Sequence, residues 1–452
     1  MLPVGPASTV PVVTSPVSAI ANEDARLDRA RNNAVLVVLM VCGYSAGVIT
    51  GPLLSRNLGD SGRGSLAAVI TPLSLLVWLP GIGIPTAAGF FAREIDPRRI
   101  MRAVWWWTVV VVVPLVVVLW FVTPLYLRHE AHETVGLLRF GLLLVPFFVP
   151  TQAALAIHFV LRGLTRSYLA LVNMPLLANA GLIILLAVSG RLTIQTAVGA
   201  WFCSNLAQVA LGTIWVHSMM RPALDREVRG KLIRYGARDA VTGSSDLLVG
   251  RLDQLILVGL VSPAVLGHYA VAANIPAITA SFAYAIGNIM FGRLRGRGVA
   301  TLAANPLRAV WITTAVSATA SLGLAVTTPF LLPLVFGRDF KASVAPLLLL
   351  LPGQVCLDAC IVLAQVTRAQ GRPGLVSIAR AVSAFPTVLL IVPVARRFGI
   401  NGAALLTSVS NLTYLVVLVT LRFRATDLGP VRVGAPGPGA VFAGVDRELS
   451  RS

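Results

Sequence analysis

The sequence predicts an all-α polytopic membrane protein, with twelve transmembrane helices in two pseudo-symmetric six-helix bundles around a central cavity. Three observations lead to this prediction: an apolar composition, an alternation of positive charge between loops, and an internal repeat. Of the 452 residues, 56% are apolar and only 12% are charged, and the mean hydropathy is +0.82. About a quarter of the residues in an average soluble domain are charged, so the composition excludes an ordinary cytosolic enzyme.

Twelve apolar segments are long enough to cross a bilayer, since a spanning helix needs about 20 residues. The stretches between them are too short to hold a soluble domain. The segments cover residues 33–54, 65–91, 103–127, 134–161, 168–189, 193–219, 233–261, 265–291, 308–334, 343–367, 374–395 and 400–421.

The positive charge of the loops supports this count. With a cytoplasmic amino terminus, 23 Lys and Arg residues fall on the predicted cytoplasmic side and 8 on the outer side. Because cytoplasmic loops carry an excess of Lys and Arg, both termini are expected in the cytoplasm, and topology explains much of the net charge of +19. An anionic cargo is the other explanation for that charge. The outer set is Arg56, Arg63, Arg128, Arg191, Arg338, Lys341, Arg396 and Arg397.

The two halves of the chain share a repeated segment. Residues 150–166 (PTQAALAIHFVLRGLTR) align with residues 352–368 (PGQVCLDACIVLAQVTR) at an offset of 202, with seven of 17 positions identical. At an offset of 203, Gly64 and Ala67 align with Gly267 and Ala270. Both copies enter on the fourth span of a half, so the halves have the same orientation. Parallel repeats of this kind are related by an axis along the membrane normal, as in transporters that work by alternating access.

The chain divides into five expected regions. These are disordered cytoplasmic tails at 1–31 and 425–452, six-helix bundles at 32–220 and 233–424, and a cytoplasmic linker at 221–232. The four cysteines all lie in apolar stretches, and their spacing indicates neither a disulfide framework nor a metal site. No metal and no cofactor is therefore expected.

Residues 51–94 carry a family pattern: a first span that ends in a basic residue and Leu-Gly, a short turn with Gly before an Ala-rich second span, and a Gly-rich bend. This hairpin resembles the first hairpin of bacterial polysaccharide repeat-unit (O-antigen type) flippases of the multidrug/oligosaccharidyl-lipid/polysaccharide exporter superfamily. The second half resembles the same family through RLDQLILVGLVSPAVLGHYAVAANI. The matching residues are Arg56, Leu58, Gly59, Gly62, Arg63, Gly64, Ala67, Gly81, Gly83, Ala87 to Gly89, Arg251, Asp253, Gly267, Tyr269 and Ala270.

The resemblance implies a flippase that moves a polyprenyl-pyrophosphate-linked oligosaccharide across the cytoplasmic membrane by alternating access. The polar head would cross between the bundles while the tail stays in lipid. It also implies coupling to H⁺ or Na⁺, contact with membrane lipids, and a glycan polymerase or glycosyltransferases as partner proteins. A monomer is expected, with no nucleic acid partner.

Buried acidic residues provide candidates for ion coupling. Asp239, Asp246 and Asp253 recur every seven residues in the seventh predicted span, which places them near one helix face. Charged groups at the bilayer centre cost about 2.5–3.5 kcal/mol on insertion scales, so this face should line a cavity or the seam between bundles. Alternatively, Arg238 and Asp239 lie at the membrane interface and Arg251 pairs with a neighbouring acid.

The tenth predicted span adds Asp358 at about the depth of Asp246. Multidrug exporters of the superfamily resemble this chain in carrying acidic residues on the seventh and tenth spans, at a cation site. We therefore expect Asp246, Asp253 and Asp358 to form an H⁺ or Na⁺ site.

Arginines are the candidates for the anionic headgroup, because guanidinium groups bind phosphate bidentately. Arg251 lies within the seventh predicted span, and a basic inner mouth could also contribute. For the mouth residues, the positive-inside signal alone is the competing explanation. The candidates at the mouth are Arg162, Arg166, Arg234, Arg238 and Arg368.

Several other residues allow two interpretations. His158 either shuttles protons or packs as a structural residue. Asn274 and Asn288 either bond neighbouring helices or contact sugar. A cluster of helix breakers should bend the second span and suits a gate, although such residues also serve packing. The breakers are Pro72, Pro80, Gly81, Gly83 and Pro85.

Rival functions share parts of this pattern. An enzyme is not expected, because the outer loops are short and neither an HExxH nor a GxxxxGK[ST] motif is present. A multidrug antiporter for cationic drugs would favour an acidic cavity in both halves, whereas the first half has no acidic residue within its spans. A flippase for lipid-linked peptidoglycan precursor typically has two more spans. Both transporters remain alternatives, as does a scaffold without transport.

Overall fold

The computed structural model describes residues 47, 49–77, 79–81, 83–162, 166–217, 226–280, 282–284, 286–287, 306–370 and 372–426. The predicted amino-terminal tail lies outside these ranges, as do residues 427–452 of the predicted carboxy-terminal tail. Throughout the described ranges the regular secondary structure is helical. This agrees with the predicted all-α class.

The first half begins with a helical stretch, Ile49–Gly81, in which Gly59 has φ 69°. A residue with positive φ interrupts a helix, and glycine adopts it without strain, so the stretch is two helical segments joined at Gly59. The stretch ends in the 3-10 turn η1 Leu79–Gly81. The elements that follow are α2 Ile84–Phe91, α3 Pro97–Trp107, the π-helical η2 Thr108–Val112, α4 Val113–Tyr126, α5 His132–Leu142, α6 Val145–Arg162, α7 Arg166–Val188 and α8 Ile194–His217.

The second half begins inside the predicted linker, since α9 starts at Arg226. Its last helix, α15, covers two predicted spans and is interrupted at Gly399, where φ is 61°. The elements are α9 Arg226–Val249, α10 Leu252–Val258, α11 Pro263–Asn274, α13 Pro306–Phe336, η3 Arg338–Ser343, α14 Val344–Ala369 and α15 Pro373–Thr426.

Seven helical stretches among the described residues are long and apolar enough to cross a membrane. Large apolar side chains are exposed on them, such as Phe121 on α4 at 74% and Phe330 on α13 at 81%. Exposed apolar surface of this extent fits a protein whose solvent is lipid. The structure is therefore that of a multi-pass membrane protein.

The bend predicted near Pro80 is confirmed. The helix ends before the 3-10 turn Leu79–Gly81 and α2 begins after Gly83, where φ is 70°. The indole N–H of Trp107, the last residue of α3, donates to the carbonyl of Pro80 over 3.0 Å. This side chain satisfies a backbone group that the interrupted helix leaves without its usual partner.

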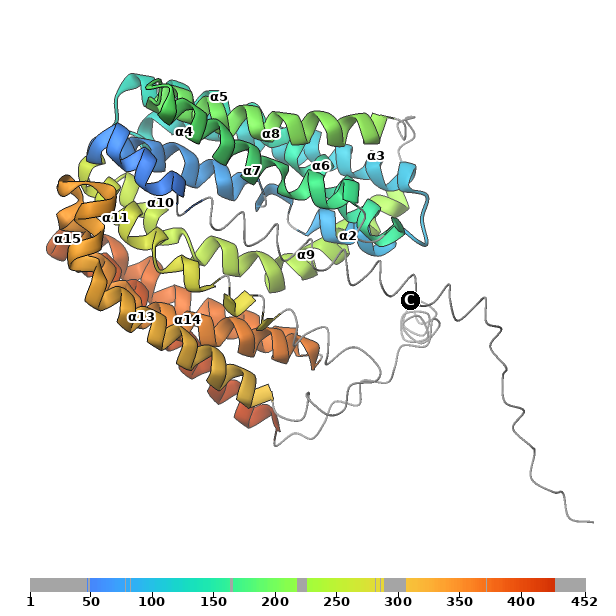
Figure 1. The fold of residues 1–452 in the computed structure, drawn as a ribbon. Coiled ribbons are helices and arrows are strands. Elements are labelled where there is room, and N and C mark those ends of the chain that lie inside the picture. The colour runs from blue at the N-terminus through green and yellow to red at the C-terminus, as the bar shows by residue number, and fades with distance from the viewer. Residues whose placement is uncertain are drawn as a thin grey trace, which may run out of the picture.

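Helices from the two halves converge at one end of the molecule (Figure 1), where α10, α11 and the turn between α4 and α5 lie. Toward the opposite end, α3 and α8 diverge from α13 and α14. Helix α9 contacts α2 and α3 of the first half as well as α15 of the second. We call the end with Asp60, Gly259 and Gly267 the convergent end.

Small residues allow close packing within the first half. A Cβ atom on Gly89 of α2 would lie 3.2 Å from Cβ of Ala156 on α6. Ala87 and Ala88 beside it are fully buried. Small residues at helix contacts are typical of membrane proteins, because lipid offers no hydrophobic drive for helix association and close van der Waals packing takes its place.

Candidate functional site

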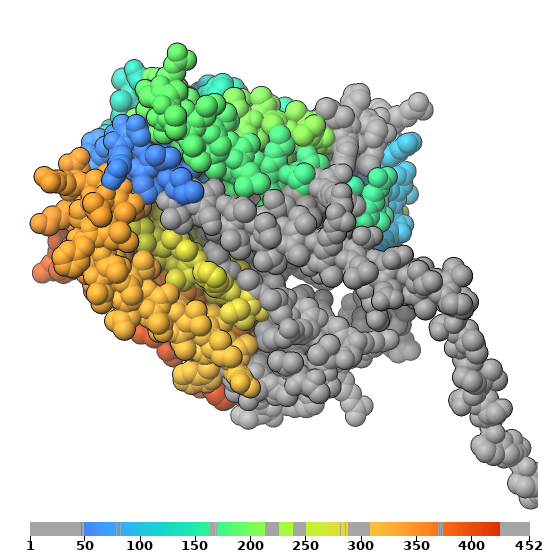
Figure 2. All heavy atoms as spheres, viewed as in Figure 1, coloured from blue at the N-terminus to red at the C-terminus, as the bar shows by residue number. Residues whose placement is uncertain are grey.

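A cavity of about 540 Å³ lies between the two halves near the convergent end. Its walls come from residues 47–63 and α7 on one side, and from the α9–α10 junction, α11 and α13 on the other. Figure 2 shows the first residues of this wall (blue) between the surfaces of α7–α8 (green) and α13 (orange). Most of the described lining is apolar, and the charged side chains among the described lining residues are Arg63 and Arg251.

Arg251 lies at a break in the seventh predicted span. Helix α9 ends at Val249, and Arg251 precedes α10 with φ −129° and ψ 3°, outside helical geometry. Its Nη1 donates to Oδ1 of Asn274 over 3.0 Å and to Oε1 of Gln254 over 3.3 Å. Both partners are neutral amides, so they orient the guanidinium without cancelling its charge. The hydrogen bond also favours the helix-bonding interpretation of Asn274.

Arg63 shares the cavity with Arg251, although the sequence placed it in an outer loop. Its Nε is buried, and no group within the described part of the chain accepts a hydrogen bond from it. Neither Arg63 nor Arg251 has a carboxylate within 4.0 Å among those residues. Buried charges are normally paired or hydrogen-bonded. The cavity therefore holds two guanidinium groups whose charges no ion pair within the described residues compensates.

The convergent end is closed by direct backbone contact. A Cβ atom on Gly64 would lie 1.7 Å from the carbonyl oxygen of Pro263, and one on Gly267 would lie 2.1 Å from that of Asp60. Any side chain at either glycine would overlap the backbone of the other half. Gly64 and Gly267 are the residues that the repeat aligns, so the closure uses equivalent positions of the two halves.

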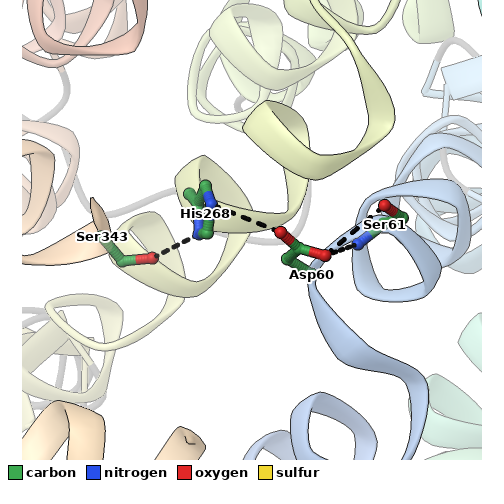
Figure 3. Close-up of polar contacts among 4 residues, drawn as sticks. All are labelled: Asp60, Ser61, His268 and Ser343. Carbon is green, nitrogen blue, oxygen red and sulfur yellow. Dashed lines mark hydrogen bonds and ion pairs between the residues drawn. The ribbon is translucent and has the colours of Figure 1, made fainter. Parts of the chain in front are cut away.

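Side chains reinforce this closure (Figure 3). Nε2 of His268 lies 3.7 Å from Oδ2 of Asp60, and Nδ1 of His268 lies 3.5 Å from Oγ of Ser343. The amide N–H of Ser61 donates to Oδ1 of Asp60 over 2.7 Å. This network joins the turn of the first helical stretch to α11 and η3.

Two arginines add contacts across the same end. Nε of Arg56 donates to the carbonyl of Val335 over 2.8 Å, and its Nη2 donates to that of Leu334. Arg128, after α4, donates to the carbonyl of Gly259 over 2.9 Å. Cations at helix C-termini interact favourably with the helix dipole. The predicted outer basic residues Arg56 and Arg128 thus join the halves.

Glu130 lies in the turn between α4 and α5 at this end. Its carboxylate accepts a hydrogen bond from the hydroxyl of Ser65. Burial raises the pKa of Glu130 above its usual range, while that hydrogen bond and the charge of His129 act in the opposite direction. Burial dominates because it disfavours the charged form of a carboxyl group.

The predicted ion-coupling residues fall into separate networks. Asp253 is buried and accepts hydrogen bonds from the hydroxyls of Tyr269 and Thr407. Asp358 is fully buried and accepts from the hydroxyl of Ser317 and, over 2.7 Å, from Nε2 of Gln354. These partners do not overlap. The side chain of Asp246 lies outside the described residues.

The predicted inner-mouth arginines lie away from the cavity that holds Arg251. Arg162 ends α6 and Arg234 lies on α9, and both side chains are exposed. Arg368 lines a small cavity of about 80 Å³ together with the buried Arg380. Asn288 and the side chains of Arg166 and Arg238 lie outside the described residues. Of the arginines predicted to bind the headgroup, Arg251 is therefore the one found in the described lining of the central cavity.

No cluster of three or more His, Cys, Asp or Glu residues suitable for a metal ion occurs within the described ranges. His158 stacks with Tyr168 at 6.3 Å between ring centroids.

The residue that sequence reasoning missed is Arg63. One signal in the sequence could have indicated it. Arg63 directly precedes Gly64, and the repeat aligns Gly64 with Gly267, which lies on the span that follows Arg251.

Comparisons with known proteins agree with this architecture. Residues 53–345 match a family model described as polysaccharide biosynthesis protein. No curated protein matches the chain.

Solved structures show the same fold. The inward closed conformation of the lipid II flippase MurJ aligns with a TM-score of 0.72 at 12% identity, covering 86% of this chain and 87% of MurJ. An inward-facing multidrug resistance MATE family transporter of the MOP superfamily aligns at 0.66 and 15% identity, covering 88% and 100%. A MOP superfamily transporter from Pyrococcus furiosus, described as having a binding pocket of reverse polarity, aligns at 0.52 and 13%, covering 88% and 96%.

Proposed function

The chain belongs to the polysaccharide biosynthesis protein family, and from this premise we propose that it is a flippase for a lipid-linked glycan. The cargo would be a polyprenyl diphosphate that carries an oligosaccharide. Its phosphates and sugars would cross the cytoplasmic membrane through the cavity between the halves, while the polyprenyl tail stays in lipid. The single observation that carries this proposal is the pair Arg63 and Arg251.

Two guanidinium groups that have no ion-pair partner among the described residues, in one apolar cavity, suit an anion with at least two charges. Arginine presents a planar fork of donors that matches phosphate oxygens. In surroundings of low dielectric constant, the attraction between such a pair and a diphosphate is stronger than in water. Nε of Arg63, which has no acceptor within the described part of the chain, and the guanidinium of Arg251, which two amides orient, supply donors for both phosphates.

The closed convergent end fits a state that loads its cargo from the opposite side. We assign the convergent end to the outer leaflet, since the positive-inside pattern places residues 56–63 there. The contacts of Gly64 with Pro263 and of Gly267 with Asp60 would then be the outer gate. Alternating access requires these contacts to break while the diverging ends of the halves approach each other.

The proposal includes the finer topology predicted from the sequence. We propose twelve spans, arranged in two six-helix bundles at 32–220 and 233–424. Both termini and the linker 221–232 would lie in the cytoplasm, and the protein would be a monomer. Asp246, Asp253 and Asp358 are proposed to couple transport to H⁺ or Na⁺. Arg162, Arg166, Arg234, Arg238 and Arg368 are proposed to attract the headgroup to the inner mouth. The partner proteins would be a glycan polymerase or glycosyltransferases.

Two alternatives share the fold. The similarity to MurJ favours a lipid-linked peptidoglycan precursor as a second cargo, because it would present the same diphosphate to Arg63 and Arg251. The similarity to MATE transporters raises efflux of cationic drugs as the other alternative. A cavity lined by Arg63 and Arg251, with no carboxylate within 4.0 Å of either among the described residues, would repel such drugs. The Pyrococcus furiosus transporter, whose reverse pocket polarity suggests a different function, is a precedent for such variation within the superfamily.

Depletion of the protein in its native cells tests the proposal. A flippase for lipid-linked glycan predicts that diphosphate-linked glycan accumulates in the cytoplasmic leaflet, detected by mass spectrometry and by resistance to externally added glycosidase. Expression of the wild-type chain should reverse the accumulation, and Arg251→Ala should not. Accumulation of peptidoglycan precursor would favour the first alternative. Drug sensitivity without any lipid-linked glycan would contradict the proposal.

A further inference from the structure

We propose that a second cavity, formed by α2, α6, α7 and α9, binds a hexopyranose ring of the transported glycan. This inference rests on the proposed function and assigns a separate site to the sugar part of the headgroup. The cavity has a volume of about 450 Å³, and its described lining carries no charged residue. The residues used below are Phe90, Gln152, Phe159, Tyr168 and Tyr235.

Aromatic rings form much of the wall. Phe90 stacks on Tyr235 with centroids 4.5 Å apart and an angle of 24°, and Phe159 lies 5.3 Å from Tyr168. Phe90 is 46% exposed and Phe159 is 43% exposed. A hexopyranose has one face of C–H groups that packs on the face of an aromatic ring, while its hydroxyls point outward. Ligand sites commonly combine such apolar walls with a few polar groups.

Gln152 supplies a polar group. Its side-chain amide, half-buried at the cavity wall, has no hydrogen-bond partner among the residues that the structure describes. An amide carries both donors and an acceptor, which matches a pair of neighbouring sugar hydroxyls. An apolar groove that only contacted lipid would place this amide against hydrocarbon at a cost.

The repeat explains why the side-chain amide of Gln152 can face the cavity. Its equivalent in the second half is Gln354, whose amide donates to Asp358 over 2.7 Å. The first-half equivalent of Asp358 is Ala156, which lines the cavity next to Gln152. One half therefore uses the glutamine to hold a buried carboxylate, whereas the other half leaves it facing a cavity with aromatic walls.

The position of this cavity determines which sugar it would bind. Tyr235 precedes Arg251 by 16 residues along the seventh span, which is about 24 Å at 1.5 Å per helical residue. A single sugar on a diphosphate held by Arg63 and Arg251 would not reach that far. The cavity is therefore assigned to a sugar several units from the diphosphate, or to the headgroup before the phosphates reach the arginines.

Binding of phosphate-free sugars by the full-length protein in nanodiscs tests this assignment. The probes are cellopentaose, chitopentaose and mannopentaose, measured by saturation-transfer NMR. We expect saturable binding of at least one pentasaccharide by the wild type. Gln152→Leu and Phe90→Leu keep apolar volume but remove the amide or the ring, and each should weaken that binding at least about fivefold. The matched control is Phe140→Leu. The ring of Phe140 stacks on that of Phe202 with centroids 4.1 Å apart, and neither residue is among the described lining residues of this cavity.

A second probe separates this inference from the proposed function. Undecaprenyl diphosphate without sugar should bind the two Leu variants and the wild type with the same affinity. Arg251→Ala should lose binding of undecaprenyl diphosphate but keep binding of the pentasaccharide. Absence of saturable sugar binding by the wild type, or equal sugar binding by the wild type and both Leu variants, would overturn the sugar site. Absence of diphosphate binding by the wild type would instead overturn the proposed function. Only variants with wild-type melting temperatures are compared.

Discussion

The backbones of Gly64 and Gly267 lie in direct contact across the two halves of the molecule. A Cβ atom on Gly267 would lie 3.0 Å from the amide nitrogen of Gly64, and one on Gly64 would lie 2.9 Å from that of Gly267. These glycines occupy equivalent positions in the internal repeat. The contact therefore closes one end of the molecule through positions that the repeat aligns, one residue away from Arg63.

We expect Gly267→Ala to open this end. The added methyl group would overlap the carbonyl oxygen of Asp60, and overpacking of this kind typically costs about 1–3 kcal/mol. The balance between states should shift toward the open form, and glycan transport should fall about tenfold or more. Thiol labelling from outside measures the opening, with Val271→Cys as the reporter because Val271 lines the cavity and is 1% exposed. Gly181→Ala, where a methyl group meets no atom within 4 Å, should leave labelling unchanged, and equal labelling of both variants would contradict the gate.

Arg63→Ala should abolish tight binding of diphosphate without destabilising the protein. The Nε of Arg63 has no partner to lose within the described residues, and removal of the side chain relieves repulsion from Arg251. Hydrogen bonds from charged groups contribute about 1.5–3 kcal/mol each, so affinity for undecaprenyl diphosphate should fall by about tenfold or more. Isothermal titration and melting temperatures measure the two effects. Unchanged affinity would remove Arg63 from the site.

Glu130→Gln should stabilise the protein at neutral pH. Burial raises the pKa of Glu130 above the ordinary value of 4.5, so ionisation of Glu130 destabilises the folded state. The folded state keeps its full stability below that ordinary pKa and loses some as pH rises through the raised value. The amide oxygen of the substituted glutamine can still accept a hydrogen bond from Ser65, as the carboxylate does.

The melting temperature of Glu130→Gln should thus exceed that of the wild type at pH 7 and equal it near pH 4. Glu133→Gln removes one exposed carboxylate on α5 and controls for the change of net charge. If the melting temperatures of Glu130→Gln and the wild type differed by the same amount at both pH values, burial of the charge would not be the cause of the difference.

Asp358→Asn tests the proposed ion coupling. The carboxylate accepts from Ser317 and Gln354, and asparagine keeps one acceptor while removing the titratable group. We expect transport in proteoliposomes to lose its response to an imposed H⁺ or Na⁺ gradient, and Asp246→Asn should behave alike. Ser317→Ala removes one hydrogen bond but keeps the carboxylate, so its gradient response should persist. Gradient-driven transport by both Asn variants would end the coupling hypothesis.

Much of the fold follows from sequence patterns that act locally. The Pro and Gly residues near Pro80 interrupt a helix wherever they occur, so the bend after Val77 could be predicted. The repeat predicted that Gly64 and Gly267 are equivalent. The contact between them depends on how two distant helices approach, and hydropathy does not report that distance.

The candidate site was only half predictable for a related reason. Arg251 lies inside an apolar run, so its burial was evident from the sequence. Arg63 lies beside Asp60, Ser61 and Gly62, a polar neighbourhood typical of an exposed loop. In the structure Arg63 lies in the helical segment after Gly59, which packs against the second half at Gly64, and its side chain lines the cavity. Asp253 and Asp358, which the sequence grouped in one ion site, accept hydrogen bonds from different side chains in this fold.

Flipping by the purified protein in proteoliposomes measures the central claim most directly. The substrate would be the diphosphate-linked glycan extracted from depleted cells, and the readout its accessibility to glycosidase added outside the vesicles. We predict rapid flipping by the wild type and none above empty vesicles by the Arg63→Ala, Arg251→Ala double variant. Equal rates for the wild type, the double variant and empty vesicles would contradict the flippase function.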